Sequence, residues 1–180
     1  AACGLGPGGA RRVDLRLLTQ RLYALMGSRL RRLNLHFEYN LDENAEWVTS
    51  DPSLVFRILL NLVTNSMKYS DSGKRIRVDL KKEKHLLSIM VSDEGPGIPN
   101  EEKEKIFQMF YRTPNTNILS KPGYGIGLAF CDLACRALGG RIWVEDAKPA
   151  GSRFVVRLPA QQIDQPVEKL RNQDAFKAFV

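Results

Sequence analysis

Residues 51–70 read DPSLVFRILLNLVTNSMKYS, and this stretch predicts a long helix at the centre of the protein. Asp51 followed by Pro52 is typical of a helix start, because the carboxylate accepts hydrogen bonds from free backbone amides and proline is tolerated in the first turn. The residues that follow are apolar almost throughout up to Tyr69, so we expect the helix to be largely buried. A turn with glycine at 71–73 indicates where it ends.

Three polar side chains stand out on this apolar helix. Asn61, Asn65 and Lys68 are spaced four and three residues apart, which at about 100° per residue places them within an arc of about 60°. In buried surroundings these groups need partners. An anionic ligand with a metal ion would supply them, because an amide oxygen can bind Mg²⁺ and an ammonium group can bind phosphate. The alternative is a polar stripe that faces solvent at the end of the helix.

Hydrophobic periodicity predicts further helices and strands around this helix. The expected helices cover residues 13–33 and about 125–138, with a short one inside 101–110. The expected strands cover residues 33–39, a short segment with Trp47 and Val48, and residues 75–82, 86–92, 141–146 and 152–159. Helices and strands come in runs instead of strict alternation. The sequence therefore predicts an α+β fold, a two-layer α/β sandwich in which helices pack on one face of a mixed β-sheet.

The chain divides into three parts by composition. Residues 1–12 are rich in glycine at their start and are interpreted as a linker or a remnant of expression. Residues 13–160 are expected to form one domain, in which residues 111–123 lack periodicity and are interpreted as a long mobile loop. Residues 161–180 form a tail that the sequence leaves unassigned.

The overall composition excludes several classes of protein. Of the 180 residues, 43% are hydrophobic and 26% are charged, values that argue against disorder, collagen and coiled coil. Apolar runs are far shorter than the roughly 20 residues of a membrane span, and no secretory signal opens the chain. Three cysteines without metal-ligand neighbours favour a reducing, cytoplasmic compartment. Cys131 and Cys135 are expected to be small core residues.

The charge balance favours no polyanionic partner. The chain has 27 Lys and Arg against 20 Asp and Glu, a net charge of +7. These charges are scattered, and the densest cluster, Arg29, Arg31 and Arg32, is interpreted as a solvated helix end. We therefore expect neither nucleic acid nor a membrane as a partner of this piece of chain.

A second motif follows the expected strand at 86–92. Asp93, Gly95, Gly97 and Ile98 lie in the sequence DEGPGI. An aspartate at a strand end can accept a hydrogen bond from an exocyclic amine such as adenine N6, while glycine permits close approach of the backbone to a flat ligand. Taken alone, this motif is more often an ordinary turn.

A third motif, GYGIGL at residues 123–128, lies where the long loop becomes a helix. Free amides at a helix start, in a segment with little Cβ obstruction, are suited to binding phosphate. No strand–helix–strand unit surrounds these glycines, so they are not a Rossmann fingerprint, and no Gly-Lys-Ser/Thr follows, so they are not a Walker loop.

The order and spacing of these motifs resemble a known family. NLVTNSMKYS is similar to the N box, DEGPGI to the G1 box, IFQMFYR to the F box and GYGIGLAFCDLACRALGG to the G2 box of sensor histidine kinases. These kinases belong to the GHKL superfamily, which has the Bergerat ATP-binding fold. The resemblance extends over about residues 13–159, and it implies a catalytic domain that uses ATP and Mg²⁺.

The resemblance implies roles for the polar residues. Asn65 corresponds to the Mg²⁺ ligand and Asn61 to the supporting amide one turn earlier. Lys68 and Arg112 are expected to face the phosphates, and Tyr69 is expected to lie near the nucleotide.

The loops receive roles in the same way. Asp93 corresponds to the residue that reads adenine, with Gly95, Gly97 and Ile98 in the base pocket. Phe107 and Phe110 correspond to the F-box anchors, or else to plain core residues. The expected lid hinge and triphosphate contact comprises Gly123, Tyr124, Gly125, Ile126, Gly127 and Leu128. Tyr124 and Ile126 depart from the commoner small residue and leucine.

The resemblance also separates phosphoryl transfer from hydrolysis. ATPases of the superfamily place a glutamate where this chain has Asn61, and an amide cannot take a proton from water. We therefore expect slow hydrolysis and transfer of the γ-phosphate to a histidine. Neither His36 nor His85 has the sequence context of an acceptor, so the acceptor is expected on a dimerisation domain outside this chain, with a response regulator as an indirect partner.

Two alternatives remain open at this stage. One is a serine/threonine kinase of the anti-sigma-factor type, against which Asn61 argues. The other is a regulator that binds ATP without catalysis. The expected location is the cytoplasm, with or without a membrane anchor elsewhere in the parent protein.

Overall fold

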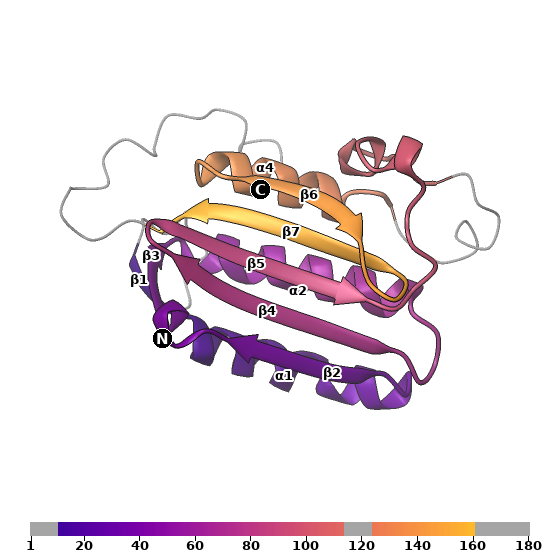
Figure 1. Ribbon diagram of the computed structural model, residues 1–180, viewed down its shortest axis with the longest axis horizontal. Coiled ribbons are helices and arrows are strands. Elements are labelled where there is room, and N and C mark those ends of the chain that lie inside the picture. Colours follow the sequence, from indigo (N-terminus) through magenta and orange to yellow (C-terminus); the bar gives the residue numbers. More distant parts are fainter. Residues whose placement is uncertain (1–10, 114–123, 161–180) are drawn as a thin grey trace.

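A five-stranded mixed sheet with helices on one face forms the body of the protein (Figure 1). The computed structural model describes residues 11–113 and 124–160. The helices within these residues are α1 (Leu15–Arg32), α2 (Pro52–Tyr69) and α4 (Gly127–Ala137). The strands are β1 (Arg11–Asp14), β2 (His36–Leu41), β3 (Trp47–Ser50), β4 (Arg75–Glu83), β5 (Leu86–Asp93), β6 (Arg141–Asp146) and β7 (Ser152–Pro159).

The strand order of the large sheet is β2-β4-β5-β7-β6. The edge strand β2 runs parallel to β4, whereas the other neighbours are antiparallel. The β4–β5 pair is the predicted hairpin, with Val78 opposite Val91. Strands β1 and β3 form a separate two-stranded sheet. The α+β prediction, a mixed sheet with helices on one face, is confirmed.

Helix α2 lies in the middle of the helical layer and contacts α1 and α4 as well as β4 and β5. Because alternate residues of a strand point to opposite faces, one set of side chains from each central strand meets the helices. The fully buried core includes Val55, Ile58, Leu59, Leu62 and Val63 of α2 together with Ile76, Val78, Leu80, Ile89 and Val91 of the sheet. The prediction that α2 is largely buried is confirmed, and Cys131 and Cys135 are buried as expected.

The starts of α1 and α2 are set by carboxylate caps. The Asp51 side chain accepts hydrogen bonds from the amides of Ser53 and Leu54 at 2.8 and 3.1 Å, as the sequence predicts. Asp14 caps α1 in the same way by accepting from the Leu17 amide at 2.9 Å. Each such cap stabilises its helix by about 1 kcal/mol.

Several predicted boundaries are wrong. Arg11 and Arg12 belong to β1 and pair with β3, so the folded part includes residues that we assigned to the linker. The predicted strand at 33–39 begins only at His36, because Asn34 adopts a positive φ of 52° in a turn. Residues 1–10, 114–123 and 161–180, which hold most of the predicted linker, most of the long loop and the tail, lie outside the described residues.

The region 101–110 also differs from the prediction. Instead of one short helix it forms two 3₁₀ turns, η2 (Asn100–Glu102) and η3 (Lys105–Phe107). The last predicted helix begins at Gly127 and not at 125, because Gly125 has a φ of +70° that no right-handed helix accommodates. Within residues 11–113 and 124–160, no helix has both the length and the apolarity of a membrane span.

Candidate active site

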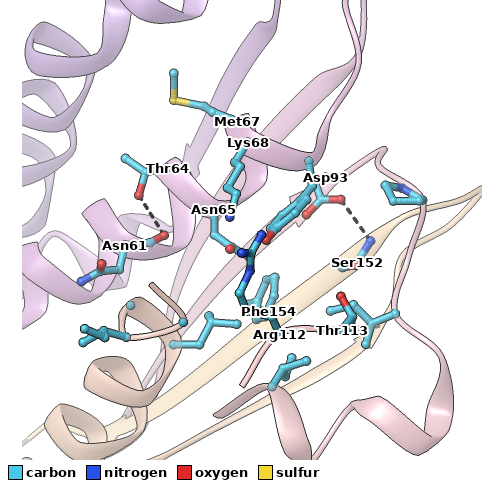
Figure 2. A pocket seen from close by; sticks show the side chains of 18 of the residues that line it. Asn61, Thr64, Asn65, Met67, Lys68, Asp93, Arg112, Thr113, Ser152 and Phe154 are labelled. Carbon is cyan, nitrogen blue, oxygen red and sulfur yellow. Dashed lines mark hydrogen bonds between the residues drawn. The ribbon is translucent and has the colours of Figure 1, made fainter. Parts of the chain in front are cut away.

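A cavity of about 560 Å³ lies between α2, the end of β5 and the start of α4. Figure 2 shows Asn61, Asn65 and Lys68 along α2, Asp93 at the end of β5, and Arg112 pointing toward them from the opposite wall. The predicted site residues that line the cavity are Asn61, Asn65, Lys68, Tyr69, Asp93, Gly97, Ile98, Arg112, Tyr124, Gly125, Ile126, Gly127 and Leu128. Of the other two, Gly95 lies just behind Asp93, and Gly123 lies outside the described residues.

The polar face of α2 forms one wall of this cavity. Asn61, Asn65 and Lys68 are half-buried there, so they are neither enclosed in the core nor a stripe open to solvent. The Asn61 amide nitrogen donates to the Arg57 carbonyl at 2.9 Å, which fixes the side chain and turns its oxygen toward the start of α4. The Lys68 ammonium lies 4.7 Å from the centre of the Tyr69 ring. This wall offers amide oxygens and a cation to a ligand.

Asp93 lines the cavity at the end of β5 and is only 5% exposed. Its Oδ1 accepts hydrogen bonds from the amides of Gly95 at 3.0 Å and Ser152 at 3.3 Å, and its Oδ2 accepts one from the Ser66 hydroxyl at 3.1 Å. Burial raises the pKa of the Asp93 carboxyl above its ordinary value, although these hydrogen bonds oppose the shift. Oδ2 keeps acceptor capacity for an amine of a ligand.

Gly95 has a positional reason to lack a side chain. A Cβ atom at this position would lie 2.9 Å from Asp93 Oδ1 and 3.2 Å from the Tyr69 carbonyl. The loop after β5 can therefore pass close to the end of α2 only with glycine here.

The start of α4 forms the second wall. The helix begins at Gly127, and no side chain in the part of the chain that the structure describes caps it. Its first amides have no intrahelical acceptor and can bind an anion. A Cβ atom at Gly127 would lie 3.0 Å from Asn61 Oδ1, which shows how closely this helix start approaches α2. Tyr124, which precedes the helix, is 85% exposed.

The segment 107–112 is hydrogen-bonded to the residues just before α4. The Phe110 amide donates to the Gly125 carbonyl at 3.1 Å. The Tyr111 hydroxyl donates to the carboxylate of Glu102, and this hydrogen bond raises the pKa of Tyr111 to about 12. Phe107 packs against the core, as an anchor would, but Phe110 is 68% exposed with a positive φ of 64°, so a core role for Phe110 is wrong.

Metal binding by protein side chains alone does not fit this cavity. In the part of the chain that the structure describes, no three His, Cys, Asp or Glu side chains are grouped so that they could hold a metal ion. Amide oxygens such as that of Asn65 are acceptable ligands for Mg²⁺, which commonly binds through one or two protein groups together with substrate phosphates. The donor set therefore fits a metal ion that arrives with a nucleotide.

Comparison with known proteins identifies the family. Residues 50–162 match the family described as histidine kinase-, DNA gyrase B-, and HSP90-like ATPase. The chain belongs to this family. The match supports ATP as a ligand of this domain.

The relatives within this family are sensor kinases. The adaptive-response sensory kinase SasA of Synechococcus sp. (strain JA-2-3B'a(2-13)) is 34% identical over 147 residues, which are 81% of this chain and 38% of the relative. The catalytic domain of histidine kinase ThkA superposes with a TM-score of 0.76 at 27% identity, over 86% of this chain and 100% of that domain. ThkA in complex with the response regulator TrrA superposes with a TM-score of 0.69 at 26% identity, over 84% of this chain and 42% of the ThkA chain. The chain thus spans less than half of SasA.

Sequence reasoning missed several residues of this site in the ATPase-family domain. Ser66 and Ser152 donate hydrogen bonds to Asp93, and Tyr111, which precedes Arg112, donates one to Glu102. Ser66 directly follows Asn65 on α2. Its position next to a predicted site residue could have marked it as a further candidate. Ser152 lies 59 residues from Asp93 and carries no local signal.

Proposed function

We propose that this domain binds Mg-ATP and transfers the γ-phosphate to a histidine on a dimerisation domain of a longer two-component sensor kinase. The observation that carries the proposal is the cavity in which an aspartate at one end, a polar helix face and an open helix start converge. The family match and the sensor-kinase relatives support it.

In this proposal, different residues bind different parts of the nucleotide. Asp93 accepts a hydrogen bond from the adenine amine through Oδ2, and the amides at the start of α4 bind the phosphates. Asn65 would hold Mg²⁺ with support from Asn61, and the metal ion would neutralise charge that develops on the transferring phosphoryl group. Lys68 and Arg112 approach the phosphates from opposite walls and orient the terminal one.

Phosphoryl transfer is favoured over hydrolysis because the Asn61 side chain is not a base. A neutral amide has no basic site that could accept a proton from water, and Asn61 already donates to the Arg57 carbonyl. The same residue argues against a serine/threonine kinase of the anti-sigma-factor type. We infer slow hydrolysis by this domain.

The phosphate acceptor is proposed to lie outside this chain. His36 and His85, the two histidines of the sequence, are both exposed, on β2 and in the β4–β5 turn. Neither lines the cavity. A response regulator as an indirect partner is supported by the ThkA–TrrA complex. A cytoplasmic location is supported by the free, buried Cys131 and Cys135.

The test is a transfer assay in two parts. The chain alone, incubated with ATP labelled on its γ-phosphate, should take up no acid-labile phosphate. Addition of the dimerisation fragment of its parent should give acid-labile phosphohistidine on that fragment. Acid-labile phosphate on the chain alone would contradict the external acceptor. Acid-stable phosphoserine or phosphothreonine would favour the other kinase class, and ATP binding without transfer would favour a non-catalytic regulator.

A further inference from the structure

A second concave surface lies on the face of the sheet opposite the helices. This groove has a volume of about 360 Å³ and lies between β4 and the turn that joins β6 to β7. In Figure 1 this face is turned toward the reader, with the helices behind it. Its cationic lining residues are Arg75, Arg77, Lys81, Lys148 and Arg153. We refer to it as the cationic groove.

The positive charge of the cationic groove is only partly neutralised. Arg77 pairs with Asp79 at 3.0 Å, and Arg75 pairs with Glu38 at 3.2 Å. Among the described residues, no carboxylate lies within ion-pair distance of the other three cations, Lys81, Lys148 and Arg153. The Arg153 guanidinium donates instead to the Ser92 hydroxyl at 3.2 Å. Lys81 and Lys148 are exposed and available to a ligand.

The spacing of the cations indicates a ligand with several negative charges. Arg77, Ser92 and Arg153 lie opposite one another on β4, β5 and β7, so the two arginines are separated by about 10 Å, two strand spacings. Lys81 lies four residues further along β4, about 13 Å away. No single carboxylate or phosphate spans these distances. An extended peptide does, because its same-face side chains recur about every 7 Å.

The chain itself contains no acidic segment that could fill the cationic groove. Residues 1–10 and 114–123 contain no acidic residue, and residues 161–180 contain three acidic and three basic residues. The occupant is therefore not one of these segments of the chain.

The lining favours a peptide over a nucleic acid. Among the described residues, none that lines the cationic groove is aromatic, so these residues offer no stacking surface of the kind on which proteins bind single-stranded bases. Asp79 and Glu94 also line it and would repel an unbroken row of phosphates, whereas a peptide can place a neutral or basic residue opposite them. We propose that the cationic groove binds an extended, acidic segment of a protein partner.

The test uses the whole chain without nucleotide, so it does not depend on the proposed kinase activity. A peptide of Glu-Thr-Ser-Thr repeats serves as the probe, because in an extended chain its Glu residues then alternate with neutral Ser residues on one face. The same peptide with Gln in place of Glu is the uncharged control. Amide NMR spectra and calorimetry are recorded at low ionic strength, where exposed charges are least screened. We expect binding of the acidic peptide only, with resonance changes in β4, β5 and the β6–β7 turn.

Paired variants identify the surface. Lys81→Glu with Lys148→Glu should weaken binding roughly tenfold, because two favourable charge contacts become repulsive. The matched control, Arg31→Glu with Arg32→Glu, makes the same change in net charge at the exposed end of α1 and should leave the affinity within about twofold. If the first pair fails to fold, Lys81→Gln with Lys148→Gln removes the charges without reversing them.

Four results would overturn the proposal. They are no response to millimolar acidic peptide, equal weakening by both variant pairs, resonance changes confined to the cavity beside α2, and tighter binding of a single-stranded RNA oligomer than of the peptide at the same residues.

Discussion

Asp93 is the residue whose hydrogen bonds most constrain the site. Its two oxygens have different partners: among the described residues, Oδ1 accepts from the backbone amides of Gly95 and Ser152, and Oδ2 accepts from the Ser66 hydroxyl alone. Because burial raises the pKa of this carboxyl on folding, its favourable contribution to stability is complete below the unfolded-state pKa and is lost as the pH rises through the folded-state pKa. Once the carboxyl is charged, its burial therefore opposes folding.

Asp93→Asn should separate recognition from stability. The asparagine oxygen can replace Oδ1, and its amide nitrogen can donate to the Ser66 hydroxyl, so the local hydrogen bonds persist. The same nitrogen would face the adenine amine donor to donor. We expect ATP affinity to fall by roughly 10- to 100-fold, as for the loss of one charged hydrogen bond. Urea unfolding at neutral pH should show equal or greater stability.

Two outcomes would count against this account of Asp93. If calorimetry showed the same ATP affinity for Asp93→Asn as for the wild type, adenine would not bind at this end of the cavity. A marked loss of stability would show that Asp93 has a structural role. Ser66→Ala is the control, since it removes one neutral hydrogen bond and leaves the carboxylate in place.

Asn65→Asp should affect the metal and phosphates more than the fold. The change adds a negative charge at nearly constant volume on a half-buried side chain that lines the cavity. The thermal midpoint should stay close to that of the wild type. ATP affinity should fall, and more so without Mg²⁺ than with it, because the metal ion screens the added charge from the phosphates. An unfolded variant would show that Asn65 is required for structure instead.

At the scale of elements, the start of α4 depends on Gly125. This residue has a φ of +70°, and a Cβ atom would lie 2.7 Å from the Tyr111 carbonyl. Gly73 has a similar φ of +81° but no atom within 4 Å of its Cβ position, which makes it a matched control. We expect Gly73→Ala to cost about 1 kcal/mol of conformational strain with no effect on ATP affinity. Gly125→Ala should cost more stability and also weaken ATP binding. Equal effects of the two changes would contradict the close packing.

The hydrogen bond between Tyr111 and Glu102 stabilises the segment 107–112, which contains Arg112. Because it raises the pKa of Tyr111 to about 12, the contact is complete below the unfolded-state pKa of tyrosine, about 10, and is lost as the pH rises through the folded-state value. Absorbance titration of the phenols should show one late ionisation that Tyr111→Phe removes. The variant should stay folded, with weaker ATP binding. A titration identical to that of the wild type would contradict the contact.

For the whole molecule, stability rests on the central strands packed against α2. Ile89 on β5 is fully buried, whereas its neighbour Ser88 points to the other face. Ile89→Ala should lower the free energy of unfolding by about 2–5 kcal/mol, because it removes buried contacts and leaves a cavity. Ser88→Ala should change it by less than about 0.5 kcal/mol. Urea unfolding of both variants checks this. Equal stabilities would contradict the assignment of Ile89 to the helix-facing side of β5 and of Ser88 to the other side.

Patterns within one element were the predictable part of this structure. The apolar run of α2, its Asp51 cap and the β4–β5 hairpin all follow from neighbours in sequence. Contacts between distant segments were not predictable in this way. Ser152 reaches Asp93 only because β7 returns beside β5, and β1 forms only because β3 is present to pair with it. Most of the predicted site residues line the cavity, because short motifs that resemble those of a known family could be recognised in the sequence. The roles assigned to these residues stay predictions.

The parallel pairing of β2 with β4 has a practical consequence for trimming the protein. The family match begins at residue 50, but β2 and α1 precede that point and cover the edge of β4 and one flank of α2. A fragment cut at residue 50 would bare the unpaired backbone of β4 and the apolar flank of α2, and such edges promote aggregation. Expression boundaries are therefore better drawn upstream of Arg11 than at the start of the recognisable motifs.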